Sequence, residues 1–244
     1  MIYQEPRLLP CGDRALSVEL GDEISQDVNA RVLALDYVLR QRAVPGILET
    51  VPSHRALLVY YDPLVVDHDA LTAALRDLAR EARPDALPPA RIVELPCCYG
   101  GELGFDLEPV AARLALSADQ VVALHAGADY SVEFVGFTPG LPYLSGMPER
   151  LHIARLERPR VKTPPGSVSI GGMQCCIYSV ESPGGFWVLG RTPARLYDPS
   201  AADPILLRAG DRVRFRSIDR AEFDAIAALA ASGSYLPRIE EPRT

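Results

Sequence analysis

Apolar residues recur with two different periods in the first third of the chain. From Ala15 to Leu20 every second residue is apolar, which is typical of a strand with one buried face. Beyond Ser25, a good N-cap residue, apolar side chains recur every three or four positions as far as Arg42. This pattern predicts a strand followed by an amphipathic helix.

Two more strands and a second helix follow in the pattern. Ile47–Val51 and Ala56–Tyr61 are apolar runs separated by a short polar turn, and leucines then recur at helical spacing after Asp67 or Asp69, either of which would cap the helix. The order β-α-β-β-α predicts a small α+β sandwich, ferredoxin-like in arrangement, over residues 1–85.

A proline-rich stretch, Ala82 to Arg91, has no apolar periodicity and marks the predicted domain boundary. A second domain is expected over residues 90–240. It begins with a strand to Cys98, two short helices, of which the second ends near His125, and a strand from Tyr130 to Val135.

From Val135 to Asp198 proline and glycine recur every few residues between short runs rich in Val, Ile, Phe and Tyr. This pattern favours a small β-barrel with shaped loops over any helical packing. Two further strand signals lie within Ile205–Phe215, and Ala221–Ser232 has the pattern of a closing amphipathic helix.

Composition narrows the class of protein. The 244 residues are 48% hydrophobic and 23% charged, values typical of a globular protein with a sizeable core, and the net charge of −7 disfavours a general nucleic-acid or anionic-membrane partner. The first ten residues contain no apolar signal-peptide core, and the longest clean apolar run, Ala56–Tyr61, is too short to span a bilayer. We expect a cytoplasmic protein.

The five cysteines include two adjacent pairs, Cys97-Cys98 and Cys175-Cys176. Neighbours on a strand point to opposite faces, so a pair does not easily offer two thiolates to one metal ion. Buried, reduced thiols and no protein-held metal site are therefore expected.

The proline- and glycine-rich loops carry the candidate binding residues. Glycine lets a backbone approach a ligand closely, and Gly140 and Gly166 are each expected to hold a conformation that a Cβ would disturb. The alternative is that these are ordinary turns of an all-β domain. The candidate binding residues are Phe137, Thr138, Pro139, Gly140, Tyr143, Pro165, Gly166, Ser167 and Gln174.

Three further residues are candidates for catalysis, two as sources of positive charge and one as a group that transfers a proton. Arg191 follows a glycine in the last loop, and Arg160 belongs to a basic segment that is either a solvated face or a source of positive potential for a carboxylate or phosphate. His125, in the last turn of a helix, is either packed in the core or part of the site, where it would move a proton if its pKa lies near neutrality. The usual nucleotide-binding and nucleophile-elbow motifs are absent from the sequence.

Several segments together resemble the family of 5-oxoprolinase B subunits, also called KipI-like or allophanate hydrolase subunit 1, and the resemblance covers nearly the whole chain. They are Gly12-Asp13-Arg14-Ala15-Leu16, Gly100-Gly101-Glu102, Leu124-His125, Gly136-Phe137-Thr138-Pro139-Gly140-Leu141-Pro142-Tyr143-Leu144, Pro165-Gly166-Ser167-Val168, Ser182-Pro183-Gly184-Gly185 and Gly190-Arg191-Thr192-Pro193.

The resemblance implies an N-terminal α/β domain followed by a cyclophilin-like β-barrel. It also implies two partners, the C and A subunits of 5-oxoprolinase, with which the chain would open 5-oxo-L-proline to L-glutamate at the expense of ATP, with Mg²⁺ and cationic side chains offsetting the developing charge. By residue type, Arg191, with Arg160 or Lys162, would supply positive charge, and backbone amides of the Gly166-Ser167 loop would cradle an anion. The chain is expected to be inactive alone.

The resemblance leaves other functions open. One is a KipI-like inhibitor that binds a sensor histidine kinase without turnover, and another is the carboxyltransferase part of a biotin-dependent urea carboxylase. The stand-alone length favours the oxoprolinase role over the second of these. Prolyl isomerase activity would rest on fold analogy alone.

Overall fold

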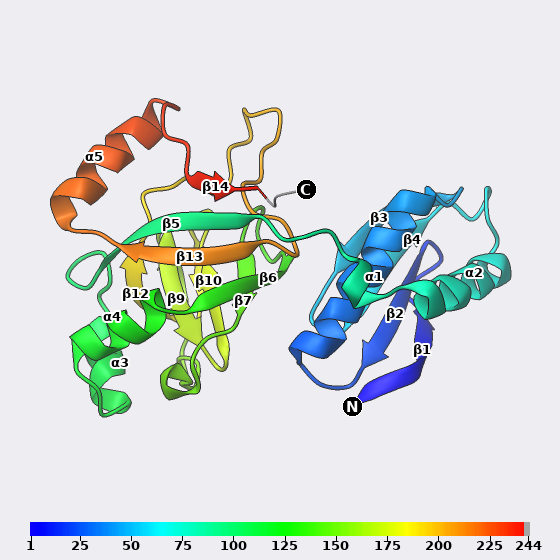
Figure 1. The fold of residues 1–244 in the computed structure, drawn as a ribbon, viewed down its shortest axis with the longest axis horizontal. Coiled ribbons are helices and arrows are strands. Elements are labelled where there is room, and N and C mark those ends of the chain that lie inside the picture. The colour runs from blue at the N-terminus through cyan, green and yellow to red at the C-terminus, as the bar shows by residue number, and fades with distance from the viewer. Residues whose placement is uncertain (242–244) are drawn as a thin grey trace. The chain divides into compact units, whose positions relative to one another are not determined.

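The computed structural model describes residues 1–241 and divides into two compact units, Met1–Pro89 and a second that begins at Ala90 (Figure 1). Each unit has its own hydrophobic core. Within the described residues, no helix has the length and apolar character needed to cross a membrane.

The first unit is a four-stranded antiparallel sheet with the strand order β1-β2-β4-β3 and two helices on one face (Figure 1). Its elements are β1 (Ile2–Pro10), β2 (Ala15–Gly21), α1 (Gln26–Arg42), β3 (Ile47–Pro52), β4 (Ala56–Tyr61) and α2 (His68–Glu81), followed by a short 3₁₀ turn (Pro84–Ala86).

The predicted alternation builds this core. Leu16, Val18 and Leu20 on β2 are buried against the apolar stripes of both helices. Ser25 caps α1 by accepting from the Val28 amide at 3.2 Å, and Asp67, the first of the two predicted caps, accepts from the Ala70 amide at 2.8 Å.

The sequence analysis missed β1. Of its nine residues only Pro6 is buried, because β1 is an edge strand that, among residues 1–241, pairs with β2 alone. Its sequence therefore has no apolar alternation to reveal it. The order of the unit is therefore β-β-α-β-β-α, and the ferredoxin-like description is not confirmed.

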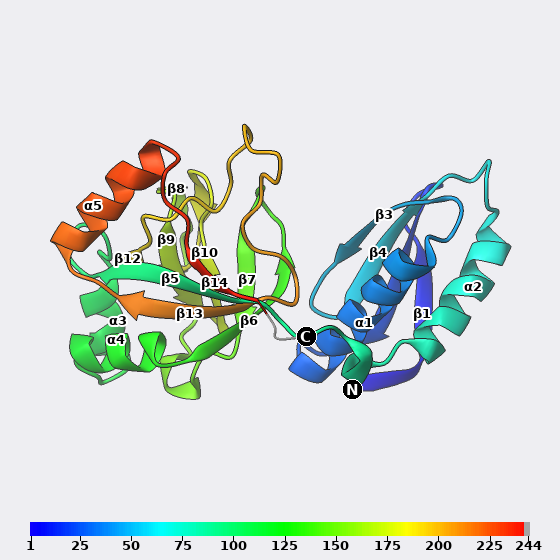
Figure 2. The same cartoon turned by 45° about the horizontal axis from the view of Figure 1, so that its top comes forward.

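The second unit is a closed barrel of seven strands with three helices and a short two-stranded ribbon (Figure 2). Its strands are β5 (Ile92–Tyr99), β6 (Asp129–Val135), β7 (Pro142–Ser145), β8 (Arg160–Thr163), β9 (Ser167–Gly171), β10 (Gln174–Ile177), β11 (Ser182–Gly184), β12 (Trp187–Arg191), β13 (Arg212–Ser217) and β14 (Arg238–Glu240). Its helices are α3 (Leu107–Arg113), α4 (Ala118–Ala126), α5 (Arg220–Ala231) and a 3₁₀ turn (Glu149–Leu151).

The barrel runs β5-β12-β9-β10-β7-β6-β13 and closes where β13 pairs with β5. That last pairing is parallel and the other six are antiparallel. The strand β14 adds to β5 outside the ring, and β8 pairs with β11 in the separate ribbon.

Successive residues of a barrel strand face the interior and the exterior in turn. On β9, Val168 and Ile170 belong to the apolar interior, so Ser167 and Ser169 lie on the outer face. Four of the five cysteines are buried as expected, whereas Cys11 is exposed, and all five are free thiols.

Candidate functional site

Several glycine- and proline-rich loops meet at one end of the barrel, which we call the loop end. Strand pairing places there the end of β6 beside the start of β7, the end of β10 beside the start of β9, and the end of β12 beside the same start of β9. The connections attached to these strand ends are residues 136–141, 164–166, 178–181 and 192–211. Loops that lie far apart in sequence therefore share one end of one sheet.

A chain of hydrogen bonds connects these loops through Tyr178 and Ser179. The Gly166 amide donates to the Tyr178 carbonyl at 2.6 Å, and the Thr192 amide donates to the Gly166 carbonyl at 2.9 Å. The Ser179 hydroxyl donates to the Pro139 carbonyl at 2.5 Å and lies 3.4 Å from the Thr138 hydroxyl. The predicted segments around Thr138, Gly166 and Arg191 are thus brought together.

Two glycines hold this arrangement in the left-handed region, as expected. Gly166 has φ of 80°, and a Cβ there would collide with the Thr192 carbonyl oxygen and lie 3.1 Å from Arg191 Cγ. Gly140 has φ of 75°, and its Cβ would lie 3.0 Å from the Cβ of Tyr197. Any other residue would be strained at both positions.

The predicted backbone cradle for an anion is wrong. The Gly166 amide is committed to Tyr178, and the Ser167 amide donates to the Pro164 carbonyl at 3.3 Å. Both amides are consumed in holding the loops together, so anion binding here depends on side chains.

Arg191 and Ser167 supply unpaired polar atoms at the loop end. The two residues are cross-strand partners between β12 and β9. Arg191 Nε is buried and Ser167 is fully buried, and neither Arg191 Nε nor Ser167 Oγ has a hydrogen-bond partner within residues 1–241. Burial lowers the pKa of Arg191, and nearby Arg220 lowers it further. An unpaired guanidinium beside an unpaired hydroxyl is suited to an anionic oxygen.

Further unpaired hydroxyls lie close by, beneath the β8–β11 ribbon. The ribbon folds back over the outer face of the barrel. A Cβ on Gly184 would collide with the Tyr178 hydroxyl, and one on Gly171 of β9 would lie 3.0 Å from the ring of Phe186, which follows β11. Ser169 on that face and Ser182 in the ribbon are buried, and their hydroxyls also have no partner in the described part of the chain. Each unpaired buried hydroxyl costs about 1–3 kcal/mol, so such groups usually bind a water molecule or a ligand.

The aromatic candidates take two different environments. Phe137 is 67% exposed and adopts a positive φ of 68°, which is unusual for a bulky residue and sets the loop beside Thr138. Tyr143 is half-buried and stacks on Phe134 with ring centroids 4.5 Å apart. Phe137 is therefore open to a partner or substrate, whereas Tyr143 is largely a packing residue.

His125 does not reach the loop end. It is fully buried in the barrel core, with Tyr99 Oη 2.8 Å from Nδ1 and Cys175 Sγ 3.5 Å from Nε2. Burial lowers its pKa to about 3. The condition under which it would transfer a proton, a pKa near neutrality, is not met.

Arg160 and Gln174 also lie elsewhere. Arg160 donates to Asp106 at 2.6 Å and to the Phe186 carbonyl at 3.1 Å, and Asp106 in turn accepts from the Val188 amide at 2.7 Å. Gln174 begins β10 at the end opposite the loop end, about 10 Å along the strand from its last residue. The Arg160 side chain is thus committed to holding the fold.

Sequence reasoning missed Tyr178, Ser179, Ser169 and Ser182. The alternation of Ser167-Val168-Ser169-Ile170 was a visible signal, since it puts two hydroxyls on one face of a strand. Nothing local indicated that a ribbon would bury that face. Within residues 1–241 no group of His, Cys, Asp or Glu is arranged to hold a metal ion.

The chain is related to known proteins over most of its length. Residues 6–207 match the sequence profile of the carboxyltransferase domain, subdomain C and D. The chain is 37% identical over 224 residues to the 5-oxoprolinase B subunit of Bacillus subtilis (strain 168), covering 88% of this chain and 93% of that protein.

Two solved structures are similar. The crystal structure of TTHA0988 superposes with a TM-score of 0.76 at 37% identity, over 84% of this chain but only 40% of that longer chain. The urea amidolyase of K. lactis superposes with a TM-score of 0.81 over 99% of this chain and 17% of its own. Its identity is 22%, so that likeness is one of fold.

Proposed function

The chain belongs to the family of 5-oxoprolinase B subunits, and from that membership we propose that it is the B subunit of an ATP-dependent 5-oxoprolinase. With the A and C subunits it would open 5-oxo-L-proline to L-glutamate. The sequence identity, which extends over most of both chains, supports this proposal more strongly than it supports any function known from a shared fold.

The observation that carries the proposal is the unpaired guanidinium of Arg191 opposite the unpaired hydroxyl of Ser167. The substrate carries a carboxylate, and its lactam is a resonance-stabilised amide that must be activated before water can attack it. ATP, with Mg²⁺, would supply a phosphoryl group to the lactam oxygen. Every anionic group in this chemistry needs fixed positive charge and hydrogen-bond donors.

The residues of this chain have separate tasks in the proposal. Arg191 donates charge-assisted hydrogen bonds to an anionic oxygen of the substrate or of the transferred phosphoryl group, and Ser167 donates its hydroxyl to the same oxygen. Thr138, held near Ser179, presents a second hydroxyl from the neighbouring loop. Gly140 and Gly166 fix the loops that place these groups.

The donor set fits an anion better than it fits a resident cation. Arg191 brings positive charge to the loop end, and the part of the chain described by the structure holds no cluster of metal-binding side chains. We therefore propose that Mg²⁺ arrives bound to ATP or is held by a partner subunit. Phe137, exposed beside Thr138, is proposed to contact a partner subunit, since aromatic side chains are favoured at interface hot spots.

His125 and Arg160 have no chemical role in this proposal. His125 is buried and neutral, and Arg160 is paired with Asp106. Both positions instead support the barrel on which the loops are mounted.

Reconstitution tests the proposal. Purified chain is assayed for glutamate release from 5-oxoproline and ATP, alone and after addition of the A and C subunits, and assembly is followed by gel filtration. We expect no turnover by the chain alone and turnover by the assembled complex. A complex that assembles but releases no glutamate would contradict the enzyme function and favour the alternative, an inhibitor of a sensor histidine kinase. The K. lactis urea amidolyase structure, at 22% identity, shares the fold with this chain and does not favour the urea carboxylase alternative.

A further inference from the structure

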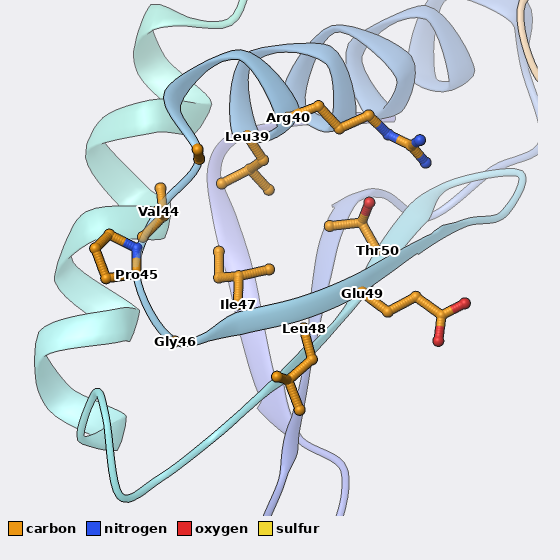
Figure 3. A pocket seen from close by; sticks show the side chains of 10 residues that line it. Leu39, Arg40, Val44, Pro45, Gly46, Ile47, Leu48, Glu49 and Thr50 are labelled. Atoms are coloured by element: carbon orange, nitrogen blue, oxygen red, sulfur yellow. The ribbon is translucent and has the colours of Figure 1, made fainter.

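A groove lies in the first unit, between the last turn of α1 and the edge strand β3 (Figure 3). Its volume is about 620 Å³, within the range of pockets that hold drug-sized ligands. It is lined by Leu39, Arg40, Ala43, Val44, Pro45, Gly46, Ile47, Leu48, Glu49 and Thr50. None of these residues belongs to the loop end of the barrel.

One end of the groove is apolar. Leu39 from α1 and Ile47 from β3 point toward each other near the connection between the two elements (Figure 3). Leu39 belongs to the buried core, and Val44 and Ile47, which pack against it, are partly exposed. Leu48, on the far side of the strand, is 60% exposed. This end is suited to an aliphatic side chain.

The other end carries an uncompensated negative charge. Arg40 donates to Asp36 at 2.9 Å, and Asp36 also accepts from the Thr50 hydroxyl, so the charge of Arg40 is balanced. The Glu49 carboxylate has no hydrogen-bond or ion-pair partner among the described residues and extends from β3 on the same side as Arg40 (Figure 3).

The β3 backbone offers free hydrogen-bonding groups along this groove. Within residues 1–241, β3 pairs with β4 on one side only. The Ser53 amide donates to the Ala56 carbonyl at 2.9 Å, so these residues form a hydrogen-bonded pair of the hairpin. Pairs alternate along an antiparallel ladder, so Thr50, three residues earlier and opposite Val59, belongs to a non-hydrogen-bonded pair. Its amide and carbonyl point away from β4, toward the open edge.

The edge is short but not blocked. A bulge between Ile47 and Glu49 and the proline at position 52 limit regular pairing on either side of Thr50. Such devices prevent uncontrolled edge-to-edge association. They leave room for one short strand, in a groove with an edge strand on one side and a helix on the other, the arrangement in which strand addition recognises extended peptides.

We propose that this groove binds an extended segment of a partner protein, which adds to β3 as a fifth strand. The segment places an aliphatic side chain against the partly exposed Val44 and Ile47, and a lysine or arginine opposite Glu49. The charge of the unit favours such a partner, because residues 1–89 contain nine arginines and no lysine against fourteen Asp and Glu, a net charge of −5. The proposal is independent of the oxoprolinase function and can fail without it.

A peptide probe tests the groove directly. The peptide acetyl-Val-Lys-Leu-Lys-Val-Lys-amide is titrated into the isotope-labelled full chain while backbone amide resonances are followed by NMR. We expect saturable shifts concentrated in residues 39–51. The same peptide with glutamate in place of each lysine should bind at least about fivefold more weakly, since each unfavourable rim charge changes the affinity by roughly 1.5- to 5-fold.

Matched variants distinguish binding in the groove from general electrostatic attraction between the peptide and the acidic chain. Glu49→Gln should weaken the lysine peptide about threefold, whereas Glu157→Gln, which removes an exposed carboxylate from the other unit, should leave its affinity unchanged. Absence of saturable shifts, shifts centred outside residues 39–51, or equal binding of both peptides would overturn the proposal. Concentration-dependent shifts of the same residues without peptide would overturn it too, since a second copy of the chain would then be the occupant.

Discussion

The barrel unit contains two clusters of buried polar groups that differ in one respect. In the core, His125 has Tyr99 at 2.8 Å and Cys175 at 3.5 Å, so its ring nitrogens have partners. At the loop end, Arg191 Nε and the hydroxyls of Ser167 and Ser169 have none within residues 1–241. A buried polar group with partners stabilises the fold it belongs to, whereas one without partners lowers stability unless a water molecule or a ligand completes it. Burial alone therefore does not identify a site.

The largest expected effect is on the core cluster. His125→Ala removes a fully buried ring, leaves a cavity and strands the Tyr99 hydroxyl, so we expect a loss of about 3–5 kcal/mol in the free energy of unfolding. Denaturant titration measures it. His152→Ala, at a half-buried position, is the matched control and should cost less than about 1 kcal/mol. Equal losses in the two variants would mean that the core cluster is not a stabilising network.

A backbone change at the loop end is expected to have the next largest effect. Gly166→Ala introduces a Cβ against the Thr192 carbonyl at a φ of 80°, so we expect a loss of about 2–4 kcal/mol in unfolding free energy together with loss of turnover by the complex.

Gly172→Ala is the control for this change. Gly172 also has a positive φ, 65°, but nothing lies within 4 Å of its Cβ position, so only the conformational strain of about 1 kcal/mol remains. Similar losses for both variants would show that the close approach of the loops at Gly166 contributes nothing.

The pH dependence of stability tests whether His125 is a buried, neutral core residue. Because His125 has a pKa of about 3 when folded and 6.5 as its ordinary value, the unfolded chain binds more protons between these values. The contribution of this group to stability is fully present above about pH 6.5 and falls by roughly 1.4 kcal/mol for each pH unit below it. Unfolding of His125→Phe should lack this component of the slope. An unchanged slope would mean that the histidine titrates normally in the folded chain.

The smallest expected change in stability is at Ser167. Its hydroxyl is fully buried without a partner, so Ser167→Ala should leave the unfolding free energy unchanged or raise it by up to about 1 kcal/mol, while turnover by the complex falls. Thermal melting and the complex assay measure the two outcomes. A clear loss of stability would reveal a partner for this hydroxyl, which would then no longer count among the buried groups without partners.

The sequence predicted much of the fold because most elements have a clear period. The helices and strands of the first unit follow their apolar rhythm, and the loops that carry Thr138, Gly166 and Arg191 were recognisable from glycine and proline. The strand β1 was missed because an exposed edge strand has no apolar alternation. The β8–β11 ribbon was missed because its short, polar strands resemble loops, and its position over β9 depends on contacts distant in sequence.

The same limit applies to the site. Residue type alone suggested both His125 and Arg191, and only the three-dimensional partners distinguish them. His125 was one residue in a helix with two open interpretations, and its burial among Tyr99, Tyr130 and Phe215 is produced by strands from across the sequence. The lack of a partner for Arg191 Nε is likewise invisible before the barrel closes.

The most direct test of this account is the activity of Arg191→Ala in the assembled complex, beside Arg195→Ala from the loop that follows β12. Arg195 is paired with Asp198 at 2.8 Å and is not part of the contrast. The account predicts that Arg191→Ala loses about 2–4 kcal/mol of transition-state stabilisation, roughly 30- to 1,000-fold in kcat/KM, while gel filtration and melting temperature stay unchanged. Arg195→Ala should retain activity. Full activity of Arg191→Ala, or failure of that variant alone to assemble, would contradict the assignment of Arg191 to an anion site.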